Sequence, residues 1–326
     1  MAFSQLLSVI LLLSPIAFAG PYPNVDGFRI AWHEPFTGPG GSAVDDRNWH
    51  IALGLHVNNE VQEYTTSSRN IQLSGGETVQ LVPWRASDGS WTSGRIESKT
   101  SFTPPAGKQF LLQASLRTGS NPSKQGIWPA FWVLGDSVKR GVDWPMCGEL
   151  DIFEQINGAM TSYATIHCQQ AQGGICNEPI GKGTTTNIPN GEFHTWSLLW
   201  DRTPGDWRSQ SITWLKDFQA FYRVSGAEVG DEGTWATLAH SPFYVILNVA
   251  VGGLFPVCPS LPRSSPLNET CKLSNEPPGA SKWCYPGRLR EHAGGGVRGG
   301  LRILLKAPRN EKANRHRRGL SSPVSA

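Results

Sequence analysis

Three carboxylates lie close together near the middle of the chain, at Glu149, Asp151 and Glu154. Read as a strand, this segment directs Glu149 and Asp151 to one face and the apolar residues between them to the other. Strict alternation would place Phe153 on the acidic face. A β-bulge, which absorbs one extra residue, returns Glu154 to that face. The sequence therefore predicts a bulged strand with three carboxylates on one side.

Crowded carboxylates favour glycoside hydrolysis, in which one carboxylate attacks the sugar or activates a water and another protonates the leaving oxygen. Neighbouring negative charges hold the proton-donating acid in its protonated form. The alternative is a solvated edge strand with incidental charges. For a retaining mechanism the strand must curve, because the two carboxyl groups of Glu149 and Glu154 must approach to about 5–5.5 Å.

The acidic segment and its surroundings resemble a known family. Gly148–Glu154 reads GELDIFE, which is similar to the E-x-D-x-x-E signature of glycoside hydrolase family 16 in its bulged, laminarinase-like form. Further blocks of that family follow one another along residues 22–253, and the set is most similar to secreted fungal endo-β-1,3(4)-glucanases. These blocks are Val57–Thr65 (VNNEVQEYT), Ser93–Ser98 (SGRIES), Gly126–Asp136 (GIWPAFWVLGD), Ala164–Cys168 (ATIHC), Gly173–Pro179 (GGICNEP) and Ile246–Gly253 (ILNVAVGG).

The resemblance implies a role for each carboxylate. Glu149 is the expected nucleophile, and Glu154 is the expected general acid and later the base. Asp151 lies between them and is expected to tune their protonation and to orient Glu149. The activity implied is retaining endo-hydrolysis of β-1,3-glucan or mixed β-1,3/1,4-glucan.

The resemblance also implies residues that contact the sugar chain. Aromatic rings stack on the apolar faces of sugars, although Trp more often fills cores, and Trp132 in the run AFWVL fits a core position equally well. For Asn59, Glu60 and Arg95, the alternative to sugar binding is a role in a turn or as a surface charge. For His167, the alternative is a structural hydrogen bond. The candidate substrate-binding residues are Trp128, Trp132, Asn59, Glu60, Arg95 and His167, with Asn248 ranked below them.

Most of the chain is a succession of short strand-like segments separated by Gly, Pro, Asn and Asp. The 36 Gly, 24 Pro and 13 Trp agree with a β-rich domain. Many short strands predict a two-sheet sandwich, and the resemblance specifies an all-β, concanavalin-A-like jelly roll with a concave substrate groove. The expected strands are 28–32, 79–82, 110–116, 128–134, 163–167, 195–200, 212–215 and 243–251.

The first residues resemble an export signal. Met1–Ala19 contains a long apolar run and ends in a small-x-small cleavage site, and the run is too short to span a bilayer. We therefore expect a secreted protein, in the medium or the cell wall. Export permits disulfides, and Cys168 and Cys176 are a candidate pair, with Cys147 as a competitor for either partner.

The C-terminal part differs from the expected catalytic domain of residues 20–253. Residues 254–326 hold 13 Lys and Arg against 4 Asp and Glu, whereas residues 1–253 hold 16 against 22. Suitable codons for 282–301, read one nucleotide later, encode NGATPDGYGSMLEVGYVAVY, which looks like the family's terminal strand. We therefore interpret 254–326 as an irregular basic tail that arises from intron read-through and a frameshift. On this interpretation the sandwich lacks its last core strand, and the chain folds poorly.

Two alternatives to hydrolysis are open. A cell-wall glucan transglycosylase would use the same glycosyl-enzyme but lengthen some chains, and a non-catalytic glucan-binding lectin would release no reducing ends. The expected partner is a β-glucan polysaccharide, with no nucleic acid or membrane partner, and the protein is expected to be a monomer. We expect no metal and no cofactor, since no zinc spacing, phosphate loop or nucleophile elbow is present. A structural Ca²⁺ site and the linkage preference stay open.

Overall fold

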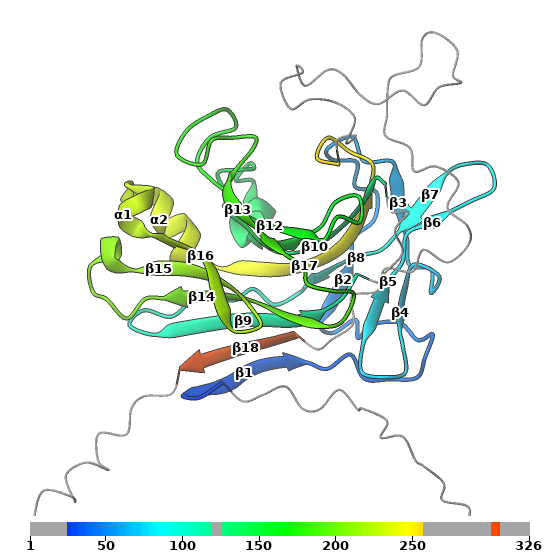
Figure 1. Ribbon diagram of the computed structural model, residues 1–326, viewed down its shortest axis with the longest axis horizontal. Coiled ribbons are helices and arrows are strands. Elements are labelled where there is room, and N and C mark those ends of the chain that lie inside the picture. Colours follow the sequence, from blue (N-terminus) through cyan, green and yellow to red (C-terminus); the bar gives the residue numbers. More distant parts are fainter. Residues whose placement is uncertain (1–24, 119–124, 257–300, 307–326) are drawn as a thin grey trace, which may run out of the picture. The chain divides into compact units, whose positions relative to one another are not determined.

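The computed structural model of the chain consists almost entirely of β-strands (Figure 1). It describes residues 25–118, 125–256 and 301–306. The chain divides into a large unit, residues 30–306, and a smaller unit made of residues 1–29 and 307–326. Of the smaller unit only residues 25–29 are described, so the expected signal Met1–Ala19 lies outside the described residues.

Six strands form the first sheet. Within it, β9, β14, β15, β16 and β18 pair in antiparallel fashion. The order across the sheet is β1 (Phe28–Glu34), β18 (Leu301–Lys306), β9 (Gln109–Leu116), β14 (His194–Asp201), β15 (Ser211–Lys216) and β16 (Gln219–Ser225).

Seven strands form the second sheet, which is also antiparallel. The segment with the three carboxylates is its third strand, β11. The order is β13 (Lys182–Asn187), β12 (Thr161–His167), β11 (Glu149–Glu154), β10 (Ile127–Gly135), β17 (Phe243–Val251), β8 (Arg95–Ser98) and β2 (Trp49–Ile51).

The remaining elements are short. Two small sheets are also present. One contains β3 (Gln62–Tyr64), β7 (Trp91–Ser93) and β6 (Trp84–Arg85), and the other contains β4 (Ile71–Leu73) and β5 (Val79–Leu81). Among the residues described, the helices are α1 (Gly226–Val229), α2 (Glu232–Ala239) and two 3₁₀ turns, Asp136–Arg140 and Trp207–Ser209. In the described part of the chain, no helix is both long and apolar enough to cross a membrane.

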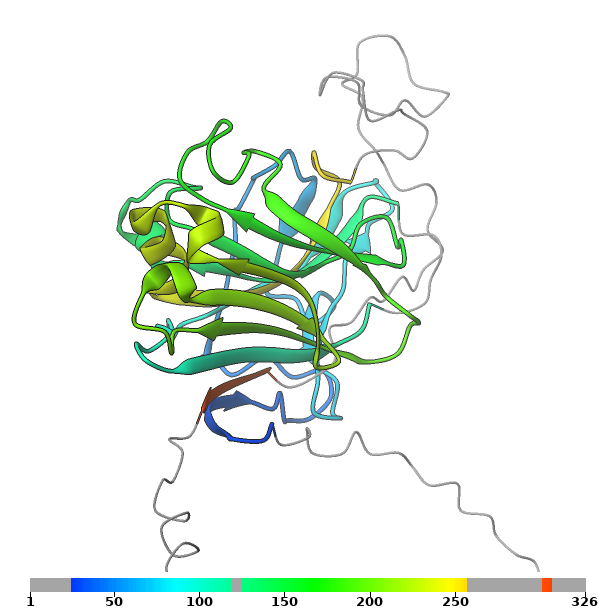
Figure 2. The same ribbon diagram turned by 60° about the vertical axis from the view of Figure 1, so that its left-hand side comes forward.

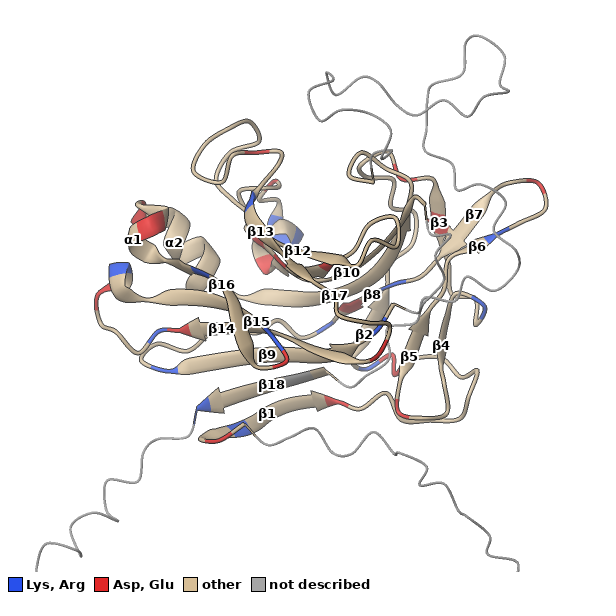
Figure 3. Cartoon of the chain, viewed as in Figure 1, with Lys and Arg blue, Asp and Glu red and all other residues tan. Residues whose placement is uncertain are grey.

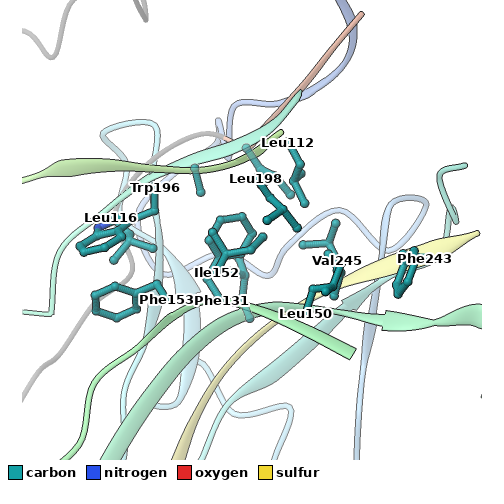
Figure 4. Packing of buried hydrophobic residues seen from close by; sticks show 14 of the residues in the cluster. Leu112, Leu116, Phe131, Leu150, Ile152, Phe153, Trp196, Leu198, Phe243 and Val245 are labelled. Carbon is teal, nitrogen blue, oxygen red and sulfur yellow. The ribbon is translucent and has the colours of Figure 1, made fainter. Parts of the chain in front are cut away.

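The two large sheets enclose one hydrophobic core. Leu112 and Leu198 enter it from the six-stranded sheet, and Leu150, Ile152 and Val245 enter from the seven-stranded sheet (Figure 4). All five are at most 2% exposed, and burying such a side chain contributes about 1.5–3 kcal/mol. Because side chains alternate along a strand, the residues between them point to the opposite face of the seven-stranded sheet. We call that opposite face the site face.

The sequence-based expectation of an all-β sandwich is confirmed, and each of the eight expected strands is present. The expectation that residues 254–326 form an irregular tail, so that the sandwich lacks its last core strand, is wrong for Leu301–Lys306. This segment, β18, pairs with β9 from Leu301 opposite Ala114 to Leu305 opposite Phe110, and it lies beside β1 in both views (Figures 1 and 2).

The side chains of β18 explain why it takes this position. Leu301, Ile303 and Leu304 are at most 3% exposed, so the run LRILLK supplies the apolar side chains that a central strand needs. The argument that the chain folds poorly for want of a core strand therefore loses its basis. Most of the tail lies outside the described residues, and its origin by read-through and frameshift stays a hypothesis.

Candidate active site

The bulge predicted for β11 is present. Opposite β10 the register skips one residue, Ile152, and opposite β12 it shifts between Asp151 and Glu154. Ile152 and Phe153 both enter the core, and Glu154 returns to the site face. The strand bulges because two successive large apolar side chains can be buried together only if the alternation is interrupted. Across the core, Trp214 Nε1 donates a 2.7 Å hydrogen bond to the backbone carbonyl of Asp151, which fixes the strand at its bulge.

Acidic stretches lie among the strands β10 to β13 (Figure 3). Burial raises the pKa of each of the three acids on β11. Burial raises the pKa of Glu154 to about 7, the charge of Glu149 adds to the shift, and a hydrogen bond from Trp128 opposes it. Burial also raises the pKa of Asp151 well above its usual range, with Glu154 and Glu149 adding to the effect. The pKa of Glu149 is raised by burial too, against the opposing charges of His167 and Arg95. Burial and mutual repulsion of the three carboxyl groups thus favour their protonated forms.

Trp128 contacts the carboxylate at the end of β11. Its Nε1 donates a 2.8 Å hydrogen bond to Glu154 Oε1, and its ring is half-buried on the site face. Phe255 packs edge-on against the Trp128 ring, with centroids 5.2 Å apart, and also against Tyr163 at 5.1 Å. The structure therefore brings Trp128 to the carboxylates, as expected, and adds two aromatic residues that sequence reasoning did not single out.

Trp132 is held on the site face and does not belong to the core between the sheets. Its Nε1 donates a 2.8 Å hydrogen bond to Asn248 Oδ1, and Asn248 Nδ2 in turn donates to the Tyr64 hydroxyl at 3.1 Å. The Arg95 guanidinium lies over the Trp132 ring, 4.9 Å from its centroid. Tyr64 was missed from the sequence, although it belongs to the same VNNEVQEYT block as Glu60.

The other residues predicted to contact the sugar, Arg95, Glu60 and Asn59, lie in different surroundings. Arg95 is only 7% exposed and pairs with Glu97 at 2.7 Å, so the surface-charge alternative for Arg95 is wrong. Glu60 accepts a 2.7 Å hydrogen bond from Gln62, and burial raises its pKa. Asn59 lies in an exposed turn at φ 57°, and its side chain is not part of the described carboxylate cluster.

His167 faces the acidic strand from β12. It stands opposite Glu149 in the register, with Nε2 4.0 Å from Glu149 Oε1 and 3.6 Å from Asp151 Oδ2. Its Nδ1 lies 2.7 Å from Glu178 Oε2, and the ring of Trp144 lies 5.3 Å away. Burial lowers the pKa of His167, but the hydrogen bond with Glu178 and the negative charge of Glu149 outweigh it, so the pKa is raised overall. Glu178 was missed, although it lies within the GGICNEP block.

The cysteines of this region are placed without ambiguity. Cys168 and Cys176 form a disulfide with Cα atoms 5.6 Å apart. Cys147, the competing partner considered from the sequence, is buried and free. The disulfide therefore closes the loop between the end of β12 and the segment that carries Glu178.

One group of side chains in the described part of the chain has the composition of a metal site. The ligand atoms of Glu149, Asp151 and His167 all lie within 4.8 Å of one another. A histidine that binds a metal must be neutral at the ligating nitrogen, whereas the acids around this His167 favour its protonated form. We therefore interpret the group as an acid–base cluster, and the prediction that the protein needs no metal stays a prediction.

A β-sandwich that carries a cluster of buried carboxyl groups with raised pKa values beside indole rings has the composition of a glycosidase site. The model of an XgeA-like, catalytic GH16 domain matches residues 62–204. The solved structure of an endo-1,3-beta-glucanase from Streptomyces sioyaensis superposes with a TM-score of 0.72 at 31% identity, over 88% of this chain and 99% of that one.

Two curated relatives agree with this match. A glucan endo-1,3-beta-glucosidase from Cryptopygus antarcticus is 28% identical over 256 residues, which are 75% of this chain and 86% of that protein. Glucan endo-1,3-beta-glucosidase A1 from Niallia circulans is 27% identical over 271 residues, and the match spans 72% of this chain but only 35% of that protein. The chain belongs to glycoside hydrolase family 16.

Proposed function

We propose that the protein is a retaining endo-β-glucanase that hydrolyses β-1,3-glucan or mixed β-1,3/1,4-glucan. The observation that carries this proposal is the unequal environment of the acids on β11. Burial raises the pKa of Glu154 to about 7, so it keeps its proton in mildly acidic solution. Burial raises the pKa of Glu149 as well, but His167, with Nε2 4.0 Å from Glu149 Oε1, opposes the shift and favours the ionised form. A retaining glycosidase needs one acid in each of these states.

The first step forms a glycosyl-enzyme. Ionised Glu149 attacks the anomeric carbon of the sugar, and a bond forms between that carbon and a Glu149 oxygen while the glycosidic bond breaks. Glu154 transfers its proton to the leaving oxygen, which departs as the hydroxyl of the shortened glucan. The Trp128 N–H, already bonded to Glu154 Oε1, then stabilises the carboxylate that remains.

The second step restores the enzyme. Ionised Glu154 removes a proton from a water molecule, and the water oxygen attacks the anomeric carbon from the side opposite Glu149. The carbon–oxygen bond to Glu149 breaks and the configuration is retained. Burial raises the pKa of Asp151 well above its usual range, which favours its protonated form and limits the negative charge between the two reacting acids.

The site face also supports sugar binding. Trp128 and Trp132 are both half-buried, and each indole is fixed by a hydrogen bond from its ring nitrogen, to Glu154 and Asn248 respectively. An indole whose orientation is fixed offers a preorganised surface for the apolar face of a sugar ring. We therefore propose that these two rings bind the glucan on either side of the scissile bond.

Two isosteric variants test the roles of the acids. Glu149→Gln should lose all turnover of laminarin and of barley β-glucan, since no nucleophile remains. Glu154→Gln should lose turnover of these glucans but keep the first step with an aryl glycoside, whose leaving group needs no proton. Glu192→Gln, in an exposed turn, is the matched control and should behave as wild type. Normal activity of Glu149→Gln would refute the assignment.

The products separate hydrolysis from the alternatives. Chromatography of laminarin digests should show shorter chains only; longer chains would indicate a transglycosylase. Binding without any release of reducing ends would indicate a lectin. We also propose that the protein is exported, because Met1–Ala19 has the composition of a signal peptide, and that it is a monomer. N-terminal sequencing of protein from the culture medium should begin at Gly20, and size-exclusion chromatography should give a monomer.

A further inference from the structure

A fourth carboxylate, Glu178, lies behind His167 and takes no part in the reaction steps above. Its side chain is 0% exposed, and each of its oxygens has a partner. Oε2 lies 2.7 Å from His167 Nδ1, and Oε1 accepts a 2.8 Å hydrogen bond from the backbone N–H of Cys168. Burial of an ionised carboxylate is unfavourable unless it is paired and hydrogen-bonded. Here the paired group is the imidazole that faces the reacting acids.

We propose that Glu178 is a positioning residue that fixes the ring of His167 and keeps it protonated, so that Nε2–H stays directed at the carboxylates of Asp151 and Glu149. The proposal rests on the proposed glucanase function. It assigns to Glu178 no contact with the substrate. Glu178 acts through the imidazole, in the way that a carboxylate behind a site histidine sets its orientation and the position of its proton.

The loop that carries Glu178 is held firmly at both ends. The Cys168–Cys176 disulfide ties it to the end of β12. Gly173 and Glu178 exchange two backbone hydrogen bonds, both of 2.8 Å. Because Cys168 directly follows His167 in the chain, the bond from its N–H to Glu178 fixes the carboxylate relative to the histidine backbone. The loop thus sets both the distance and the direction of the His167–Glu178 pair.

The chain after Glu178 also packs against the imidazole. Gly181 has φ 81°, and a Cβ there would lie 2.8 Å from His167 Cε1 and 2.3 Å from a methyl group of Thr165. Only glycine therefore lets the chain pass this close to the ring. On another side, the Trp144 ring lies 5.3 Å from the imidazole at 47°. His167 is thus confined by the loop and by an aromatic ring as well as by its ion pairs.

The charges around His167 explain why its protonation matters. The groups that face it are Glu149, Asp151 and Glu154 from β11 and Glu178 from the loop, all of them acids. In the described part of the chain, the ion pairs of Glu149 and Asp151 are both made with His167. A protonated imidazole favours the ionised form of the nucleophile, Glu149. If His167 lost its proton, this effect on the pKa of Glu149 would be lost as well.

The direct test is Glu178→Gln. Gln keeps the size of the side chain and an acceptor for the Cys168 N–H, but its amide donates to His167 Nδ1 and the imidazole becomes neutral. We expect kcat on laminarin to fall about 10- to 100-fold, with KM changed less than about threefold because no substrate contact is lost. In ¹H–¹⁵N spectra, the His167 signals, assigned with a His167→Gln variant, should titrate at lower pH than in wild type.

Two outcomes would overturn the proposal. One is an unchanged His167 titration in Glu178→Gln, whatever happens to kcat, because Glu178 would then be merely structural. The other is an unchanged kcat although the titration moves. Glu178→Asp keeps the charge on a shorter side chain, so it should keep the high titration point and recover part of kcat. If Glu178→Gln does not fold, Glu178→Asp alone decides: a His167 titration as low as that of an exposed histidine refutes the proposal.

The chain offers a closely matched control outside the site. On β14, His194 Nδ1 lies 2.7 Å from Asp217 Oδ2, and the N–H of the next residue, Thr195, donates to Asp217 Oδ1 at 2.9 Å. Asp217→Asn therefore removes the same kind of charge from the same geometry. It should leave kcat and its pH dependence as in wild type; an equal loss would refute a specific role for Glu178. If wild type releases no sugar from either glucan, the proposed function fails, while the His167 titration still tests Glu178.

Discussion

The hydrogen bond from Trp128 to Glu154 makes a prediction whose sign and size follow from the structure. Trp128 Nε1 donates to Glu154 Oε1 at 2.8 Å, so it stabilises the ionised carboxylate and lowers its pKa. The pKa is nevertheless about 7, because burial raises it by more. Trp128→Phe keeps an aromatic ring for the sugar but removes the donor. The pKa of Glu154 should therefore rise further.

The size of the shift can be worked out from general magnitudes. A hydrogen bond to a charged group contributes about 1.5–3 kcal/mol, and one pKa unit corresponds to about 1.4 kcal/mol. Loss of the donor should therefore raise the pKa by about one to two units. Glu154 must be protonated to act as the acid, so kcat/KM falls as pH rises through this pKa. The basic limb of the profile should move from about 7 in wild type to about 8–9 in the variant.

The assay is release of reducing ends from laminarin between about pH 4 and 10, with kcat/KM plotted against pH, since this ratio reports groups of the free enzyme. Trp132→Phe is the matched control. Its Nε1 donates to the neutral side chain of Asn248 at 2.8 Å, so its rate can fall but its basic limb should not move. A limb that stays in place in Trp128→Phe, or moves to lower pH, would refute Glu154 as the general acid.

Three further predictions concern stability. Glu154→Gln should not alter stability below about pH 4.5, where Glu154 is protonated in both the folded and the unfolded chain. Above about pH 7 it should stabilise the fold by up to about 3 kcal/mol, because the folded-state pKa of Glu154 is raised from 4.5 to about 7. Urea unfolding at pH 4 and pH 8 measures this difference, and an equal effect at both pH values would contradict it. Replacing Cys168 and Cys176 together by Ala should cost about 2–3 kcal/mol, since the disulfide closes a short loop; an unchanged urea midpoint would show that the bridge is dispensable. Ile303→Ala, at a residue 1% exposed, should cost about 2–5 kcal/mol if β18 fills the core, and a change below about 0.5 kcal/mol would refute that placement.

Much of the fold could be predicted from the sequence because its signals are local. Alternation within each strand and the Gly, Pro and Asn between strands are enough to place all eight expected strands. The bulge in β11 follows from Ile152 and Phe153, two adjacent apolar residues that both need burial. β18 was missed because a strand of six residues, Leu301–Lys306, lies in a segment whose overall composition is basic and rich in Gly. Composition over a long window conceals an apolar run of this length.

The candidate site shows a different limit. Glu149, Asp151 and Glu154 share one short strand, so spacing alone brings them together. The Arg95–Glu97 pair could also have been found, since residues two apart on a strand share a face. Glu178 could not be found in this way. Its contact with His167 depends on a loop closed by a disulfide, and no periodicity in the sequence fixes the direction of a loop side chain.

The chemistry of the site depends on both kinds of contact. Glu149 and Glu154 are the same residue type on one strand, and both are buried, so the sequence alone gives them equivalent properties. Burial raises the pKa of both, and a different neighbour opposes it at each: the charge of His167, oriented by Glu178, at Glu149, and the Trp128 hydrogen bond at Glu154, whose pKa still reaches about 7. Acid–base roles arise where environments push the pKa values of two groups apart. In this protein the motif therefore supplies the buried acids, and residues from β10, β12 and the disulfide loop set how far burial raises the pKa of each one.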